Sequence, residues 1–314
     1  MSALTPLRRA CWIAAIFVLP WRAAGHDFWI QPSTFTPEVD ELVQLSLRIG
    51  HAQESTPVIR DASRIDRFVI RGPDGEDQKV IGLDGRDPAG WVRTRQAGTH
   101  IVGYQSHPAA IELPAEKFES YLEMEGLEPI LKERAARRET GRSGRERYVR
   151  CAKTILRAGP NHVEYKRRLG LTLELVPQGD PAVSSSDPLP FLVLYAGAPC
   201  AGLQVTAVHR DLHGSRLTAR SDRNGEVHLA LDRAGVWRLT AVHMVRSASG
   251  TGHEWESYWA SLTFLRGEQP STPPTATQVS SDSSPEPGSA HSPRKMLEWL
   301  NRLRGSSRPP APGP

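Results

Sequence analysis

The sequence predicts a mainly β protein with two β-sandwich domains, Ig-like or prealbumin-like, and a helical insertion. Short runs of alternating apolar residues recur along the chain, and turns rich in Gly, Pro and Asn separate them. One segment lacks this alternation and repeats its apolar residues at helical spacing instead. We therefore expect a first sandwich over 26–113, a helical insertion over 114–158 and a second sandwich over 159–266.

The chain begins with a segment typical of a secretory signal. Two arginines precede a short apolar run at 10–20, and Ala23 and Gly25 supply the small residues of a cleavage site. We expect residues 1–25 to be removed and the mature protein to lie in the periplasm or outside the cell. The rest of the sequence holds no apolar run of about 20 residues, so we expect no membrane span in the mature chain.

Several short strands are expected in the first sandwich. Val43, Leu45 and Leu47 alternate with polar residues, which is the period of a half-buried strand. The sequence Gly-Pro-Asp-Gly at 72–75 is typical of a turn. The expected strands are 43–49, 64–71, 79–83, 98–106 and 111–113.

Helices are expected in the insertion. Phe118, Tyr121 and Leu122 are spaced to share one face of a helix, and Ile130 and Leu131 continue the pattern. The predicted helices are 115–125, 128–138 and 145–156, with a loop at 139–144 before the last one.

Alternation returns in the second sandwich. Leu169, Leu171 and Leu173 alternate with polar residues, and the Asn-Gly pair at 224–225 suits a hairpin turn. The tail 267–314 is rich in Ser, Pro and Thr, so we expect disorder apart from a short basic amphipathic pattern at 294–304. The expected strands are 162–176, 190–195, 203–209, 226–231, 236–245 and 254–265.

Composition and motifs exclude several classes of function. The formal net charge of +4 is modest and the basic excess is local, so we expect no nucleic-acid partner. Cys11 leaves with the signal, and we expect no disulfide between the remaining Cys151 and Cys200. No HExxH, Cys-x-x-Cys, nucleophile elbow or phosphate loop occurs. Nothing in the sequence supports hydrolysis or phosphoryl transfer.

A metal site is expected at the mature N-terminus. Cleavage after Gly25 would make His26 the first residue, and its imidazole and α-amine could then chelate one metal ion. Asp27 adds an oxygen beside these nitrogens. Nitrogen-rich sites favour ions such as Ni²⁺, Co²⁺ and Cu²⁺. Cleavage one residue earlier would leave Gly25 first and remove the chelating pair. The alternative to a metal-binding role is that a histidine stands at this position by chance.

Three further residues are candidate ligands or supporting groups. His51 ends the expected strand 43–49, His243 lies mid-strand among apolar residues, and Glu256 interrupts an aromatic strand. Each has an ordinary alternative: an exposed turn histidine for His51, a hydrogen-bonded core histidine for His243, and the solvent face of an edge strand for Glu256.

Several blocks of sequence together resemble a known family. They are His-Asp-Phe-Trp at 26–29, Ile-Glu-Leu-Pro-Ala-Glu-Lys-Phe at 111–118, Gly-Arg-Glu-Arg-Tyr at 144–148, Ala-Val-His-Met at 241–244 and Trp-Glu-Ser-Tyr-Trp-Ala-Ser-Leu at 255–262. The chain resembles a bacterial family of exported proteins, a domain of unknown function linked to nickel and cobalt uptake. The resemblance implies a periplasmic protein that binds a transition metal and hands it to a membrane transporter.

The sequence therefore predicts a periplasmic binding protein for nickel or a related ion, with no enzymatic activity. His26, Asp27, His51, His243 and Glu256 are its expected metal-site residues. Two alternatives remain open. One is a copper-dependent oxidative enzyme that uses the N-terminal histidine chelate, and the other is a structural or adhesive β-sandwich module.

Overall fold

The computed structural model describes residues 27–50, 54–160, 163–183, 188–212 and 216–267. The expected signal, His26, His51 and the expected tail lie outside these described residues. Within them the chain forms strands β1 to β17 and two α-helices, with one short 3₁₀ turn at Ala62–Arg64. The protein is mainly β, as the alternating patterns predict.

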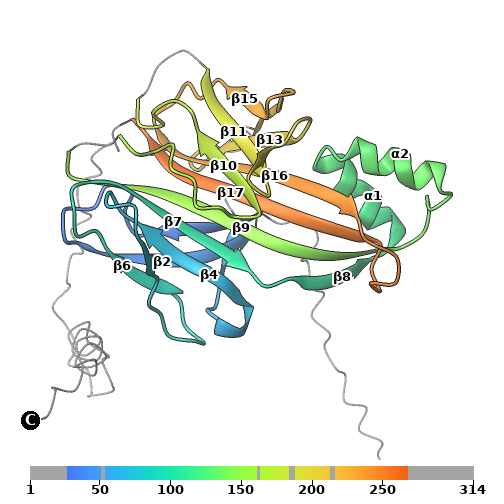
Figure 1. Ribbon diagram of the computed structural model, residues 1–314, viewed down its shortest axis with the longest axis horizontal. Helices are drawn as coiled ribbons and strands as arrows, with labels where there is room; N and C mark the ends of the chain where they lie inside the picture. Colours follow the sequence, from blue (N-terminus) through green and yellow to red (C-terminus); the bar gives the residue numbers. More distant parts are fainter. Residues whose placement is uncertain (1–26, 51–53, 161–162, 184–187, 213–215, 268–314) are drawn as a thin grey trace, which may run out of the picture. The chain divides into compact units, whose positions relative to one another are not determined.

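A nine-stranded central sheet organises the fold (Figure 1). Its strand order is β14-β13-β16-β17-β9-β7-β4-β5, and β8 pairs with the first part of β9. β17 and β9 run parallel, whereas the other neighbours are antiparallel. The strands are β4 (Ile65–Arg71), β5 (Asp77–Lys79), β7 (Gly98–Ser106), β8 (Ala109–Leu113), β9 (Gly144–Ala158), β13 (Gln204–His209), β14 (Arg216–Arg220), β16 (Gly235–Arg246) and β17 (Trp255–Arg266).

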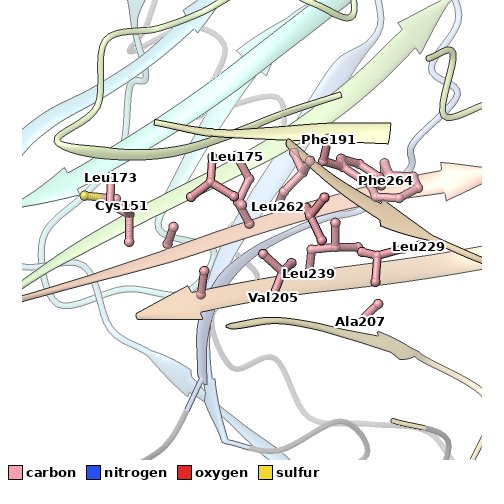
Figure 2. Close-up of a cluster of buried hydrophobic side chains, with 14 of the residues drawn as sticks. Cys151, Leu173, Leu175, Phe191, Val205, Ala207, Leu229, Leu239, Leu262 and Phe264 are labelled. Carbon is pink, nitrogen blue, oxygen red and sulfur yellow. The ribbon is translucent and has the colours of Figure 1, made fainter. Parts of the chain in front are cut away.

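Two smaller sheets pack on the central sheet. The first is β1 (Asp27–Pro32), β2 (Leu42–Gly50), β3 (Ser55–Val58) and β6 (Gly90–Arg93). The second is β10 (Leu173–Pro177), β11 (Leu189–Tyr195), β12 (Ala198–Pro199) and β15 (Glu226–Leu229). The second sheet and the central sheet enclose the largest core, where Leu175 and Phe191 lie among Leu239, Leu262 and Phe264 (Figure 2).

The two helices cover one end of the central sheet (Figure 1). They are α1 (Ala115–Met124) and α2 (Glu128–Ala136). Phe118, Tyr121 and Leu122 are buried, and Tyr121 stacks on Trp259 with ring centroids 5.3 Å apart. The apolar residues whose spacing predicted these helices therefore form the side of the helices that packs on β16 and β17.

Alternation along β16 separates two faces of the central sheet. Leu239 and Ala241 point into the core under the second sheet, whereas Val242 and Met244 point toward the helices. We call the first side the β10 face and the second side the helix face. The first sheet also packs on the helix face, since its core includes Leu156 of β9.

The sheets do not separate at the predicted domain boundaries. The central sheet takes strands from each of the segments 26–113, 114–158 and 159–266, and the described residues up to 267 belong to one compact unit. The central sheet is therefore the middle layer of two sandwiches, one with each outer sheet. Alternation within single strands cannot reveal this arrangement, because it says nothing about which strands pair.

The predicted helix at 145–156 is wrong, because this segment is part of the fifteen-residue strand β9. Both faces of β9 are covered: Val149 and Ile155 join the core on the β10 face, while Ala152 and Leu156 pack under the first sheet. A strand that is buried on both faces loses its apolar–polar alternation. Its apolar residues then match helical spacing by coincidence.

Other boundaries also differ from those expected. The expected strand 79–83 is β5 followed by a single bridge between Ile81 and Trp91, and strand 162–176 begins only at Leu173. β1, β3, β6, β12 and β14 were not expected as strands. β1 consists of the residues that follow His26, so the family motif opens the first sheet.

Candidate functional site

The motif His-Asp-Phe-Trp is anchored on the helix face by one arginine. Arg238 of β16 donates a hydrogen bond of 2.7 Å to the Asp27 carboxylate. Its guanidinium carbon lies 3.9 Å from the centre of the Trp29 ring, a cation–π contact. Arg238 is buried, and burial lowers its pKa while Asp27 opposes this shift. Asp27 and Trp29 together therefore hold one buried cation.

Further contacts fix β1 to the layer beneath it. Thr263 of β17 donates a 2.9 Å hydrogen bond to the Ile30 carbonyl. Phe28 packs against Tyr104 with ring centroids 5.1 Å apart. Asp27, Phe28 and Trp29 thus have packing roles, and His26 lies outside the described residues.

Glu125 lies close to this anchor. It follows α1 directly, only 7% of it is exposed, and its carboxylate forms no hydrogen bond with the described residues. Burial raises its pKa to about 7, and the nearby Asp27 adds to the shift, whereas Arg216 and Arg150 oppose it. A buried carboxylate that has no hydrogen-bond partner among the described residues and lies within electrostatic range of Asp27 is a candidate ligand for a cation.

A second buried acid lies under α1. Glu146 accepts a hydrogen bond of 3.1 Å from Ser257, and its second carboxylate oxygen has no hydrogen-bond partner among the described residues. Burial raises its pKa to about 7. Arg150 is close enough to oppose this shift, and it lies over the Trp259 ring at 4.7 Å. The helix face therefore carries two acids that ionise near neutral pH.

His243 lies on the β10 face, at the edge of the main core. Its Nδ1 is 3.9 Å from the Cys200 Sγ, and its ring centroid is 4.3 Å from that of Tyr195. Burial lowers the pKa of His243 and raises that of Cys200. Both side chains are half-buried, and Cys200 is a free thiol.

Glu256 lies on the same face and is surrounded by polar groups. Tyr258 donates a 3.1 Å hydrogen bond to it, and His253 and Arg147 lie 3.5 Å and 3.9 Å from its other oxygen. With Tyr258 and Arg147 it lines a cavity of about 280 Å³. Tyr258 is therefore the hydrogen-bond donor to this carboxylate, and Arg147 adds a longer ion pair.

The fold does not bring together the three expected site residues that the structure describes. Asp27 lies on the helix face, whereas His243 and Glu256 lie on the β10 face, so the central sheet separates them. Alternation in β16 is the reason, since Arg238 and His243 have opposite parity. Within the described ranges, no three His, Cys, Asp or Glu side chains gather as a metal site. His26 and His51 lie outside those ranges.

Sequence reasoning missed Glu125, Arg238 and Cys200. Glu125 stands among other acids at the end of a helix, Arg238 alternates with apolar residues like any strand residue, and Cys200 lies in a turn. No local pattern marks any of them, because tertiary packing alone places them beside Asp27 or His243.

Neither helix of the described chain is long and apolar enough to cross a membrane.

Comparisons with known proteins identify a family and only remote structural similarity. A family model described as "Domain of unknown function (DUF4198)" matches residues 23–245. No curated protein matches the chain. The D0-D1 domain of intimin is 12% identical, with 76% of this chain and 97% of that chain covered and a TM-score of 0.19.

Two bacterial alpha-2-macroglobulins are also similar over 76% of this chain. A variant from Salmonella is 12% identical with a TM-score of 0.20, and the Escherichia coli protein activated by porcine elastase is 10% identical with a TM-score of 0.18. The chain spans 15% and 20% of the length of these two chains.

Proposed function

Because the chain belongs to the domain-of-unknown-function family DUF4198, which the match over residues 23–245 establishes, we propose a function for it from the motif that opens β1. The protein is a periplasmic binding protein for a divalent transition metal, with Ni²⁺ the first candidate and Co²⁺ and Cu²⁺ the next. It captures the ion and delivers it to a membrane transporter, without chemistry on a substrate. The burial of Glu125 within electrostatic range of Asp27 supports this proposal.

The proposed ligands are the α-amine and imidazole of His26 together with the Glu125 carboxylate. His26 is the covalent neighbour of Asp27, so a chelate formed by its two nitrogens would lie close to Asp27, which is within electrostatic range of Glu125. Two nitrogens and one carboxylate oxygen suit nickel, cobalt and copper better than magnesium or calcium. His51 remains a candidate for a further ligand.

Asp27 has a positioning role in this proposal. One oxygen of its carboxylate is engaged by Arg238, so the ion pair sets the orientation of this side chain. The ion pair instead fixes the start of β1, and the stacking of Trp29 on Arg238 makes this start rigid. Rigid support of this kind lowers the cost of holding a ligand set in place.

Proton release from Glu125 would accompany metal binding. Its pKa of about 7 means that about half of the carboxyl groups are protonated at neutral pH. A metal ion competes with this proton, so affinity is expected to fall as the pH is lowered through 7. Replacement of Glu125 by glutamine should remove part of this pH dependence.

The test is a calorimetric titration of Ni²⁺ into the mature protein that begins at His26. We expect one ion per chain, with binding abolished in His26→Ala and weakened about tenfold in Glu125→Gln. Glu123→Gln, in the exposed last turn of α1, is the matched control and should bind as the wild type does. The same titration with Co²⁺ and Cu²⁺ ranks the ions.

Unchanged binding in His26→Ala would refute the proposal. So would equal affinity in a form with one extra residue before His26, because the α-amine would no longer belong to the chelate. Mass spectrometry of the exported protein establishes the first residue. His243→Ala should leave Ni²⁺ affinity unchanged, since His243 lies on the other face of the sheet.

The same material tests the two alternatives predicted from the sequence. Copper-dependent oxygen consumption in the presence of a reductant would favour an oxidative enzyme. Failure to hold any divalent metal after dialysis would favour an adhesive module of Ig-like or prealbumin-like sandwiches.

A further inference from the structure

We propose that Cys200 and His243 form a second metal site, on the β10 face, that binds a soft monovalent ion of the Cu(I) class. The site is separate from the one proposed at His26, because the central sheet lies between them. Its donors are one thiolate sulfur and one imidazole nitrogen, and soft thiolate ligands select Cu(I).

The two donor atoms already face each other. The Cys200 Sγ lies 3.9 Å from the His243 Nδ1. The backbone of Cys200 is fixed on both sides of its Cα, because its N–H donates to the Val193 carbonyl at 2.9 Å and its own carbonyl accepts from the Ser221 hydroxyl at 2.8 Å. His243 is held within the regular pairing of β16 and β17. Both ligands are thus positioned before an ion arrives.

The separation of the donors favours an ion of low coordination number. With metal–sulfur and metal–nitrogen bonds of about 2.3 Å and 2.0–2.1 Å, a tetrahedral ion places its S and N ligands about 3.6 Å apart. The observed 3.9 Å corresponds to an S–metal–N angle of about 130° at those bond lengths. Such an angle is wider than tetrahedral and close to the trigonal value, which suits a three-coordinate Cu(I) or Ag(I) ion with a solvent molecule as its third ligand.

The charge of the surroundings favours a monovalent ion. Desolvation alone shifts the pKa of His243 and of Cys200, with no contribution from a charged side chain of the described residues. A monovalent ion bound to one thiolate and one neutral imidazole gives an uncharged unit. A divalent ion would leave a net positive charge in a half-buried position where no carboxylate of the described residues affects the pKa of either ligand.

Aromatic rings shield the pair while leaving it accessible. The Tyr195 ring lies 4.3 Å from the His243 ring and 5.2 Å from the Tyr258 ring, measured between centroids. Cys200, His243 and both tyrosines are half-buried, so an ion can reach the sulfur from solvent. Binding replaces the thiol proton, which is released to solvent, and the ion takes its place between Sγ and Nδ1.

The test uses Ag(I), which needs no reductant, and Cu(I) under anaerobic conditions with a chromophoric Cu(I) chelator as competitor. Native mass spectrometry should find one Ag(I) at this site, and Cu(I) binding should produce thiolate charge-transfer absorbance in the ultraviolet. Cys200→Ser should weaken Cu(I) binding about 100-fold and remove the absorbance, and His243→Ala should weaken binding about tenfold.

Matched controls separate this site from others. Cys151→Ala removes the other thiol, which is buried and whose pKa burial raises to about 12, and His228→Ala removes an exposed histidine of β15. Neither should change Cu(I) affinity. His26→Ala should keep the Cys200 site while losing the proposed Ni²⁺ site, so failure of one proposal is distinguishable from failure of the other.

Two results would overturn the inference. One is Cu(I) affinity that is unchanged in Cys200→Ser. The other is alkylation of the Cys200 thiol in the wild type at the same rate with and without Ag(I). That result would mean that Cys200 and His243 form only a thiol–imidazole hydrogen bond.

Discussion

At the scale of single residues, Arg238 connects the family motif to the body of the protein. It is buried, bonded to Asp27 at 2.7 Å and stacked on Trp29, yet it comes from a strand far along the chain. Removing one partner of a buried pair leaves the other charge uncompensated, which is strongly destabilising. The motif therefore depends on Arg238 for its position.

Arg238→Met should destabilise the protein by about 3–5 kcal/mol, because Asp27 would remain partly buried without its cation. Urea unfolding at neutral pH measures this loss. Arg210→Gln is the control, since Arg210 forms an exposed pair with Asp211 and its removal should cost less than about 1 kcal/mol. Equal effects of the two substitutions would contradict a central role for Arg238.

Glu146 gives a pH-dependent contribution to stability. Burial raises its folded-state pKa from 4.5 to about 7, so the folded protein binds this proton more tightly than the unfolded chain does. This tighter proton binding contributes fully to the free energy of unfolding below pH 4.5, and the contribution is lost as the pH rises to about 7. Glu146→Gln should remove this loss, worth about 3 kcal/mol at most.

The measurement is urea unfolding of the wild type and Glu146→Gln at several pH values between 4.5 and 8. Relative to the wild type, the variant should gain stability as the pH rises. Glu116→Gln, an exposed residue of α1, should follow the wild type. Parallel stability curves for wild type and Glu146→Gln would rule out a buried proton at this carboxylate.

At the scale of elements, β9 is the strand on which the three layers depend. It pairs with β7, β8 and β17, and both of its faces are covered. Lys153 of β9 is buried and donates a 2.7 Å hydrogen bond to the buried Glu174 of β10. Glu174 also accepts hydrogen bonds from the backbone N–H groups of Leu169 and Gly170. The pair therefore connects β9 to the second sheet and to the loop that precedes β10.

Lys153→Met should destabilise the protein by about 3–5 kcal/mol at pH 7, because Glu174 would be left as a buried anion. The loss should be smaller near pH 4, where the carboxylate can take up a proton. Thermal unfolding at the two pH values checks this. Lys79→Met, at an exposed position of β5, is the control and should have little effect at either pH. An equal loss at both pH values would contradict the ion-pair argument.

β9 also shows why the element types were only partly predictable. Helices α1 and α2 have one buried face, and their spacing revealed them. Strands such as β2 have one core face and were also recognised from alternation. β9 is buried on both faces, so its sequence carries no period that distinguishes strand from helix.

At the scale of the whole molecule, the shared central sheet decides which residues can act together. Strands from the two predicted sandwiches pair side by side, so the helix face and the β10 face belong to both halves of the chain. Residues that are close in sequence, such as Arg238 and His243, are directed to opposite faces. The two metal sites that we propose therefore lie on opposite faces of this sheet and do not form a single cluster.

The sequence by itself determined the mainly β class, the two helices of the insertion and membership of the family. These depend on local periods and short motifs, which need no knowledge of partners. Only the tertiary structure decided that one sheet runs through both halves, that Arg238 meets Asp27 with Glu125 within electrostatic range, and that His243 faces Cys200 instead. Strand pairing joins residues distant in the chain, and the side to which a residue points is set by that pairing and not by its neighbours in sequence.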